Sequence, residues 1–258
     1  RAFLSRPKAL IIAKANVKSR VHRRAHLDYI GVKLFDGDGQ LQGELRIVGL
    51  FTASAYTNTT GEVPYLRHKV AKVVARAGFD PASHAGRALL NVLENYPRDE
   101  LFQIDEETLY RFAIDVMNLS ERPRVRALAR VDEFDRFVSV LVFVPKDRFD
   151  TSIRLRVGEF LARVFEGRLS ASYPAYPEGP LARTHYIIGR DEGETPKVSR
   201  EDLEKGIASI VRTWADALRD RLDDTIGGHR ARALAARYAD AFSAAYREAF
   251  GAEQAIVD

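Results

Sequence analysis

A glycine-rich turn between two apolar runs is the feature that most restricts how this chain can fold. The runs occupy residues 27–35 and 44–51 and flank Asp36-Gly37-Asp38-Gly39. Glycine accepts a positive φ and aspartate hydrogen-bonds its own backbone, so these four residues have the chemistry of a tight turn. Residues 27–51 are therefore predicted to form a β-hairpin, and the apolar run at residues 9–15 predicts a strand before it.

Helices are predicted to follow this sheet. Residues 52–60 are polar and predict a loop, after which apolar residues at helical spacing predict a helix over residues 64–77 that ends at Gly78. Ser83 is placed to cap a second helix, and Asp105 is placed to open a third. The first module is therefore predicted to contain its strands first and its helices afterwards.

The stretch Leu89–Ile104 lies between the second and third of these helices. Pro97 cannot continue a helix and biases the preceding residue to an extended backbone, so the apolar helical run should end at Tyr96. Charges of both signs follow at residues 98–100, and Leu101 and Phe102 return to the interior. From its residues alone we interpret this stretch as a connector.

Residues 124–189 repeat the order at a smaller scale. The predicted elements are strands at residues 124–131 and 137–144, a helix at residues 153–164, and strands at residues 169–173 and 181–189. The second strand is almost continuously apolar, which is typical of a central strand covered on both faces. With residues 52–60, the proline-rich residues 174–180 are the loops best placed to make contacts on the surface.

The last part of the chain is predicted to be helical. Residues 193–196 have the composition of a linker, and Ser199 with Asp202 is a capping pair for one long helix that continues through Leu222. Gly227-Gly228 should break it, and a second helix should run through Leu234 and Tyr246.

The predicted fold class is α+β. Two small sandwich modules, each an antiparallel sheet with helices on one face, precede a helical extension. The expected domains are residues 1–121, residues 122–198 and residues 199–258.

Composition excludes several classes of protein. The chain has 258 residues, of which 46% are hydrophobic, and it has no cysteine. Disulfides and thiolate chemistry are therefore excluded, and a reducing, cytoplasmic location is expected. No apolar run reaches the roughly 18 residues of a membrane span. The chain does not begin with methionine and has no signal-peptide pattern, so we expect it to be part of a longer protein.

The N-terminal residues are strongly basic, in a chain whose net charge is +4. The basic residues are Arg1, Arg6, Lys8, Lys14, Lys18, Arg20, Arg23 and Arg24. Such a cluster is compatible with a nucleic-acid-binding surface, which we keep as the alternative function. The other interpretation is a solvated edge or a contact with the rest of a longer chain.

Motifs of known chemistry are missing. Gly37, Gly39 and Gly43 have the wrong spacing for a dinucleotide loop, and a strand follows them instead of a helix. His22 and His26 lie four residues apart near Asp28 but lack further ligands for a metal. We therefore assign no catalytic, cofactor-binding or metal-ligating residue.

Several stretches together resemble the large bacterial NAD-specific glutamate dehydrogenases. They are Val21-His22-Arg23, Asp28-Tyr29-Ile30-Gly31-Val32-Lys33, Gly49-Leu50-Phe51-Thr52, Arg67-His68-Lys69-Val70, Ala77-Gly78-Phe79-Asp80, Tyr96-Pro97-Arg98-Asp99-Glu100-Leu101-Phe102-Gln103, Glu121-Arg122-Pro123-Arg124-Val125, residues 141–148, Arg237-Tyr238-Ala239 and residues 241–248. The eight-residue stretch from Tyr96 to Gln103 is the most distinctive.

The resemblance implies a place within a longer subunit. Residues 1–121 would be PAS-like and residues 122–198 ACT-like, ahead of a catalytic part that oxidises L-glutamate to 2-oxoglutarate and ammonia with NAD. The family's catalytic lysines, aspartate and dinucleotide loop have no counterparts in this sequence. We therefore expect a regulatory or oligomerisation segment that is inactive by itself and holds no cofactor. Its expected partners are the rest of the parent chain, other subunits and a small effector such as an amino acid, without a membrane.

Overall fold

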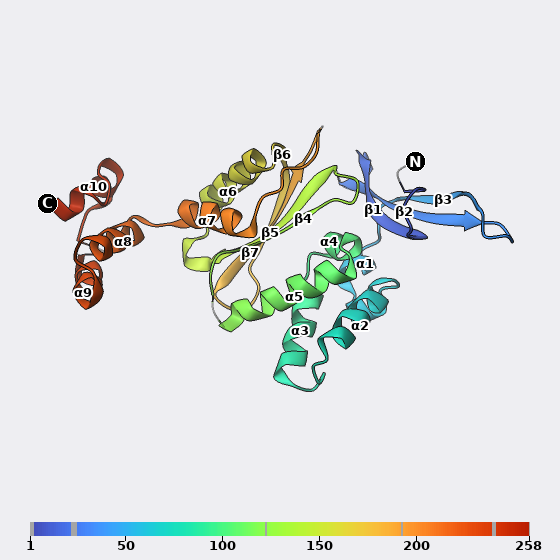
Figure 1. Ribbon diagram of the computed structural model, residues 1–258, viewed down its shortest axis with the longest axis horizontal. Helices are drawn as coiled ribbons and strands as arrows, with labels where there is room; N and C mark the ends of the chain where they lie inside the picture. The colour runs from blue at the N-terminus through green and yellow to red at the C-terminus, as the bar shows by residue number, and fades with distance from the viewer. Residues whose placement is uncertain (1–2, 22–24, 122, 192, 239–240, 258) are drawn as a thin grey trace. The chain divides into compact units, whose positions relative to one another are not determined.

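The structure is a computed structural model, shown in Figure 1, that describes residues 3–21, 25–121, 123–191, 193–238 and 241–257. Contacts divide the chain into two compact units. The first contains residues 1–124, 128–140 and 177–179, and the second contains residues 125–127, 141–176 and 180–258.

A three-stranded antiparallel sheet begins the first unit. Its strands are β1 (Leu10–Lys18), β2 (His26–Phe35) and β3 (Leu41–Gly49), in the order β1-β2-β3. The predicted hairpin is confirmed, with Val32 paired to Leu45. In its turn the Asp36 carboxylate accepts the N–H groups of Asp38 and Gln40, and these backbone bonds lower the pKa of Asp36. Gly39 has a φ of 77°, which explains why glycine is needed there.

Helices make up most of the remaining first unit. They are α1 (Ser54–Thr57), the 3-10 turn η1 (Thr60–Glu62), α2 (Leu66–Ala77), α3 (His84–Glu94), α4 (Arg98–Gln103) and α5 (Glu106–Glu121). The predicted signals are confirmed: Gly78 ends α2 in the left-handed conformation, the Ser83 hydroxyl accepts the Gly86 N–H, and the Asp105 carboxylate accepts the Thr108 N–H. Buried leucines hold these helices together, among them Leu66, Leu89, Leu93, Leu101 and Leu109.

Two predictions for the first unit were wrong. Residues 52–60, expected to be a loop, contain α1 and the start of η1. The connector within Leu89–Ile104 contains α4, which begins directly after Pro97 with Asp99 and Glu100 in its first turn. Proline is well tolerated where a helix starts, because that position needs no N–H donor. Helices this short give no usable apolar periodicity, so the sequence pattern does not reveal them.

The second sheet has the strand order β4-β5-β7-β6. Its strands are β4 (Arg126–Val131), β5 (Phe137–Pro145), β6 (Arg168–Ala175) and β7 (Leu181–Gly189), with helix α6 (Thr151–Val164) between β5 and β6. The predicted ββαββ order is confirmed. So is the central place of β5, whose residues 138–144 are all buried. Two antiparallel sheets with helices make the chain α+β, as predicted; the expected domain boundaries stay a prediction.

Within the described residues, five helices complete the second unit. They are α7 (Arg200–Val211), α8 (Trp214–Ile226), α9 (Gly228–Tyr238), α10 (Ala244–Ala249) and α11 (Gln254–Val257). Ser199 caps α7 as predicted. None of the helices in the described ranges is long and apolar enough to cross a membrane.

The prediction of one helix from Ser199 through Leu222 was wrong. The chain is extended at Arg212, and Thr213 forms a reciprocal capping box with Asp216 that starts α8. The second predicted helix is also divided, because α9 ends at Tyr238 and Ser243 caps α10. In both cases a Ser or Thr side chain offers the backbone N–H groups an alternative to continued helix.

The close approach of helix α3 to the backbone of Asp80 can be tested by substitution of Gly86. A Cβ at this position would lie 2.2 Å from the Asp80 carbonyl oxygen. Alanine normally stabilises a helix by about 1 kcal/mol relative to glycine. Because the Cβ would clash with the backbone of Asp80, we expect this clash to outweigh the gain and Gly86→Ala to lower the thermal unfolding midpoint. Gly37→Ala is the control, because nothing lies within 4 Å of its Cβ position. A Gly86→Ala variant as stable as the parent chain would contradict the tight packing.

Candidate functional site

The short helix α4 is held at its C-terminal end by one buried lysine. Lys69 Nζ donates to the carbonyl oxygens of Leu101, Phe102 and Ile104 at 2.8, 3.0 and 2.6 Å. A helix leaves its last carbonyls without partners and carries partial negative charge there. The three N–H bonds of an ammonium group match the three carbonyls, so Lys69 closes the end of α4.

Burial has a cost for this lysine. Lys69 is only 3% exposed. Desolvation lowers the pKa of Lys69 to about 7, although Glu100 and Glu106 favour the charged form. The ring of Tyr65 lies under the ammonium, 4.8 Å from Nζ to the ring centroid, which is a favourable cation–π distance.

Glu100 fixes the first turn of α4 through a buried ion pair. Its carboxylate accepts two hydrogen bonds from the Arg130 guanidinium, one of them 2.8 Å long between Nη2 and Oε2. Burial alone would lower the pKa of Arg130, but Glu100 outweighs it and the pKa is raised. Removing either partner would leave an uncompensated buried charge, which commonly costs about 3–5 kcal/mol.

Asp99 joins α4 to the first sheet. Lys14 Nζ lies 2.9 Å from Asp99 Oδ1 and 2.6 Å from Asp28 Oδ1. The Tyr56 hydroxyl donates to Asp99 at 2.8 Å, and burial, with Asp99, raises the pKa of Tyr56 to about 12. The second Asp28 oxygen accepts the Phe51 N–H at 2.7 Å. The charged residues 98–100, which the sequence suggested only as part of a connector, thus form the centre of a network within the first unit.

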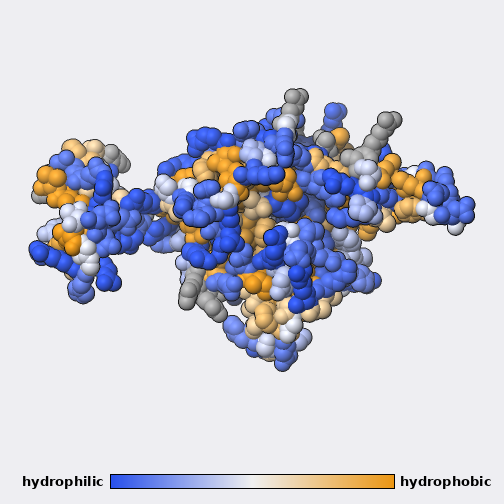
Figure 2. Space-filling view, in the orientation of Figure 1, coloured by the Kyte–Doolittle hydropathy of each residue, from blue (hydrophilic) through white to orange (hydrophobic). Residues whose placement is uncertain are grey.

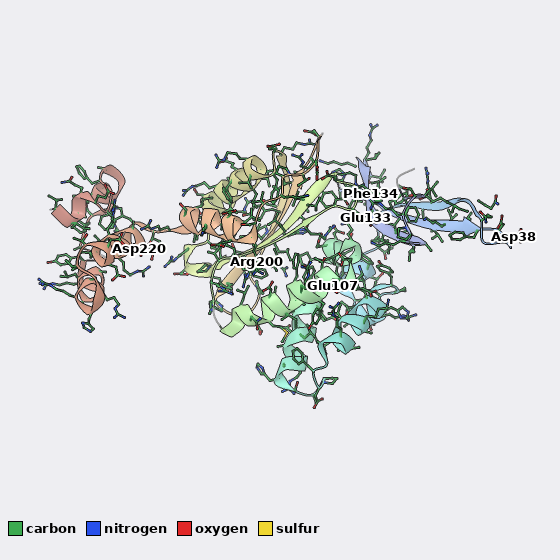
Figure 3. All side chains as sticks on the ribbon, in the orientation of Figure 1. Asp38, Glu107, Glu133, Phe134, Arg200 and Asp220 are labelled. Carbon is green, nitrogen blue, oxygen red and sulfur yellow. The ribbon has the colours of Figure 1, made fainter. Side chains whose placement is uncertain are left out.

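A cavity of about 530 Å³ lies beside this network. It is lined by Lys8, Leu10, Ile11, Ile12, Ala13, Tyr65, Lys69, Arg76, Gln103, Ile104, Asp105, Glu106, Glu107, Arg130, Asp132, Glu133 and Phe134. Figure 3 labels three of them, Glu107 on α5 and Glu133 with Phe134 in the turn between β4 and β5. The cavity therefore has an apolar strand on one side and charges of both signs around it.

The charges on the cavity wall are largely paired with one another. Lys8 Nζ lies 3.2 Å from Glu133, and Arg76 makes two hydrogen bonds to Glu107. Gln103 differs, because its buried Oε1 accepts no hydrogen bond from the described part of the chain while its Nε2 donates to the Asp99 carbonyl. A ligand with N–H groups would find an acceptor there.

Tyr65 is the strained residue of the cavity. Its φ is 71° and its ψ is −52°, a region that side-chain-bearing residues rarely occupy, and such a backbone costs about 1–3 kcal/mol. Burial raises the pKa of Tyr65, and Glu106 and Glu133 add to the effect. The surrounding contacts hold this strain in place, which is a common property of ligand-binding sites.

The residues considered from the sequence have other roles. His22 lies outside the described residues, and His26 Nδ1 lies 3.0 Å from the Ala15 carbonyl oxygen. No group of three or more potential metal-ligating side chains occurs within the described ranges. Of the basic N-terminal residues, Arg6 and Lys8 bond to Glu133, and Lys14 bonds to Asp28 and Asp99.

Sequence reasoning missed Lys69, Tyr65 and Arg130. One signal was present for Lys69, which follows Leu66 by three residues and precedes Val73 by four. That spacing puts the lysine on the apolar face of its helix, where a charged residue needs buried partners. Tyr65 and Arg130 give no such local signal, because their roles depend on distant segments.

Lys69 generates a prediction about pH. Since its pKa is lowered from 10.5 to about 7 in the folded chain, between these values the unfolded chain binds a proton that the folded chain lacks. The contribution of Lys69 to the free energy of unfolding should therefore rise with pH between these two values, by about 1.4 kcal/mol per unit of pKa shift. We expect the difference in unfolding free energy between the unmodified chain and Lys69→Met to grow in favour of lysine from pH 7 to pH 10.

The matched control is Lys72→Met in the same helix, whose lysine side chain is 66% exposed. The difference in unfolding free energy between Lys72→Met and the unmodified chain should not change over the same pH range. If the difference in unfolding free energy for Lys69→Met is also independent of pH, the prediction is contradicted. The three carbonyls would then keep Lys69 protonated throughout this range.

Three family profiles match the chain. They are glutamate dehydrogenase helical motif 1 over residues 63–122, the glutamate dehydrogenase ACT2 domain over residues 126–215, and glutamate dehydrogenase helical motif 2 over residues 221–258. Helical motif 1 covers α2 to α5 and therefore contains Lys69 and the whole of α4. The predicted ACT-like character of the second module is confirmed, whereas a PAS-like first module stays a prediction.

Curated relatives match the chain over nearly its whole length. NAD-specific glutamate dehydrogenase from Halomonas elongata is 38% identical over 99% of the chain, and that from Pseudomonas aeruginosa is 34% identical over 100%. NAD-specific glutamate dehydrogenase from Mycobacterium tuberculosis is 32% identical over 97%. The chain spans 16% of the length of each relative. It belongs to the large NAD-specific glutamate dehydrogenase family, of which it represents the segment with helical motifs 1 and 2 and the ACT2 domain.

Proposed function

We propose that this chain is a regulatory and assembly segment of an NAD-dependent glutamate dehydrogenase. The parent protein would oxidise L-glutamate to 2-oxoglutarate and ammonia and pass hydride to NAD. The similarity to proteins named NAD-specific glutamate dehydrogenase over 97% or more of the chain carries the proposal. The match to an ACT2 domain supports a role other than catalysis for this segment.

In this proposal the chemistry belongs to another part of the parent chain. The titratable residues with shifted pKa values in the first unit, such as Lys69, Arg130 and Tyr56, are engaged in holding α4. Their hydrogen-bonding groups face carbonyls and carboxylates of the chain itself. The chain by itself should therefore neither reduce NAD nor oxidise glutamate.

The cavity beside α4 is the proposed effector site. Its wall combines cations such as Lys8 and Arg76 with carboxylates such as Glu106 and Glu133, around an apolar strand. An α-amino acid carries both an ammonium and a carboxylate, so it would replace both partners of a wall ion pair such as Lys8–Glu133, while its side chain would meet the apolar strand. A ligand that prefers one arrangement of α4 and its partners would shift the population of that arrangement, which is the physical basis of regulation at a distance.

Ligand binding is tested by thermal unfolding of the chain with free amino acids, 2-oxoglutarate, NAD and adenine nucleotides. A ligand that binds only the folded state raises the midpoint with its saturation. We expect a shift with at least one amino acid and loss of that shift in Glu106→Gln, whose side chain lines the cavity. Glu201→Gln, on an exposed helix face outside the cavity, is the control.

The outcomes separate the alternatives. No shift with any amino acid would overturn the proposed effector site. A shift with NAD alone would indicate a dinucleotide site inside the chain and contradict a purely regulatory role.

Assembly is tested in the parent protein. Removal of residues 1–258 should leave a catalytic remainder that fails to reach the oligomeric state of the intact protein, measured by light scattering after gel filtration. Normal assembly of the remainder would overturn the assembly half of the proposal and leave regulation as the function.

The alternative, a nucleic-acid-binding module, is less well supported. Lys8 and Lys14 of the basic cluster already form ion pairs with Glu133, Asp28 and Asp99. Lys14 is also largely buried, with 18% of its side chain exposed. These charges would have to leave carboxylate partners before they could bind phosphates.

A further inference from the structure

Tyr65 connects the backbone turn before α2 with the lysine that closes α4. It is the N-cap residue of α2, and its backbone has a φ of 71° and a ψ of −52°. The turn is closed across Tyr65 by one backbone hydrogen bond, from the Arg67 N–H to the Val63 carbonyl oxygen at 3.0 Å. An N-cap residue normally has an extended backbone with a negative φ. The position of Tyr65 at the start of a helix therefore does not by itself require the strained conformation.

The unusual backbone of Tyr65 brings its ring to Lys69. Lys69 follows Tyr65 by four residues, and its backbone N–H donates to the Tyr65 carbonyl oxygen at 3.1 Å. The centroid of the Tyr65 ring lies 4.8 Å from Lys69 Nζ. The direction of a side chain depends on the backbone that carries it. A change of Tyr65 to an ordinary N-cap backbone would therefore turn the ring away from the ammonium.

Lys69 differs from the other basic residues of α2 in its burial. Arg67, Lys72 and Arg76 are exposed, and Figure 2 shows hydrophilic surface where Figure 1 draws α2. Lys69 is only 3% exposed and donates to the last carbonyls of α4. In this arrangement, further segments of a longer chain could only add to its burial. Because a cation–π contact is stronger when it is desolvated, loss of the Tyr65 ring would weaken the hold of Lys69 on α4.

Two opposing free energies act on Tyr65. Backbone strain favours relaxation to a negative φ, whereas the contact with the buried ammonium favours the observed backbone. The two free energies are of the same order of magnitude, so neither backbone conformation is favoured by a wide margin. A residue balanced in this way has two states, and a ligand that prefers one of them shifts the population toward it.

The Tyr65 side chain also lines the cavity beside α4. Burial raises the pKa of Tyr65, and Glu106 and Glu133 add to the rise. Both of these carboxylates belong to the cavity wall, and both therefore lie within electrostatic range of the Tyr65 hydroxyl. One side chain thus meets the cavity and also the lysine that closes α4.

We propose that Tyr65 is a two-state latch on α4. In the closed state its strained backbone places the ring against Lys69, and the lysine holds the last carbonyls of α4. In the open state the backbone relaxes, the ring leaves Lys69 and the end of α4 is released. This inference rests on the proposed effector site and gives its means of regulation, since an amino acid that displaces the ring would open the latch.

The hold of Tyr65 on α4 is tested in the parent protein by hydrogen–deuterium exchange, without any added effector. The peptide over residues 97–105 reports on α4. Tyr65→Ala removes the ring, so we expect this peptide to exchange about twofold to thirtyfold faster, which is the range of a cation–π contact. Tyr65→Phe retains a ring and should leave the exchange unchanged. The peptide over residues 84–94, which forms α3, is the control and should be unchanged in both variants.

A double substitution separates the latch from simple packing. A latch acts through Lys69, whereas a packing contact of Tyr65 with other residues does not. Tyr65→Ala should therefore cause no further change in exchange of residues 97–105 in a protein that already carries Lys69→Met. Lys72→Met is the matched control, because it removes an exposed lysine of the same helix, and Tyr65→Ala should retain its full effect in that background.

The two backbone states are tested by nuclear magnetic resonance of the chain labelled with 15N-tyrosine. The amide and α protons of one residue lie closer together when φ is positive, so the cross-peak between them is strong in the closed state. We expect a strong cross-peak for Tyr65 in the unmodified chain and a weak one in Lys69→Met, which lacks the ammonium that holds the ring. The Tyr65→Phe spectrum identifies the Tyr65 signal, and circular dichroism establishes that each variant is folded.

Three results would overturn the latch. Unchanged exchange of residues 97–105 in Tyr65→Ala would show that Tyr65 does not hold α4. A full effect of Tyr65→Ala in the Lys69→Met background would show a packing role that is independent of the lysine. A strong Tyr65 cross-peak in Lys69→Met would show that the backbone has one state. None of these results bears on the thermal shift with amino acids, which tests the effector site separately.

Discussion

The contact between the Lys69 ammonium and three carbonyls of α4 is the interaction on which the first unit depends. A six-residue helix is too short to be stable by itself. Its last carbonyls are instead satisfied from outside by Lys69, and the Glu100–Arg130 ion pair anchors the side chain of its first turn. The helix therefore exists because α2 and the end of β4 present charges to it.

The contacts that hold α4 also link it to the residues that line the cavity. Asp99, Glu100 and the last carbonyls of α4 connect four separate segments, namely β1, α1, α2 and the end of β4. The same segments, or residues adjacent to them, line the cavity, whose strained Tyr65 and acceptor Gln103 lie next to the network. Under the proposed function, a molecule that occupies the cavity would act directly on the groups that position α4.

Much of the secondary structure was predictable because its signals are local. The Asp36–Gly39 turn, the Ser83, Asp105 and Ser199 caps and the apolar run in β5 depend on residues next to one another in sequence, and all occur as expected. The errors in the C-terminal helices were also local in origin. Thr213 and Ser243 divide two predicted helices because their hydroxyls compete for backbone N–H groups, a preference that apolar periodicity does not register.

The sequence by itself determined the family, the α+β class and the order of the strands and of the longer helices of the two modules, because those depend on motifs, periodicity and turn residues. Only the tertiary structure decided that residues 98–103 are helical, that Lys69 is buried and that a cavity lies beside them. These features arise from pairs such as Lys69 with Ile104 and Glu100 with Arg130, which are 35 and 30 residues apart. A buried charge is stable only when its partner is in place, and the partner of a given charge is fixed by the packing of the whole unit.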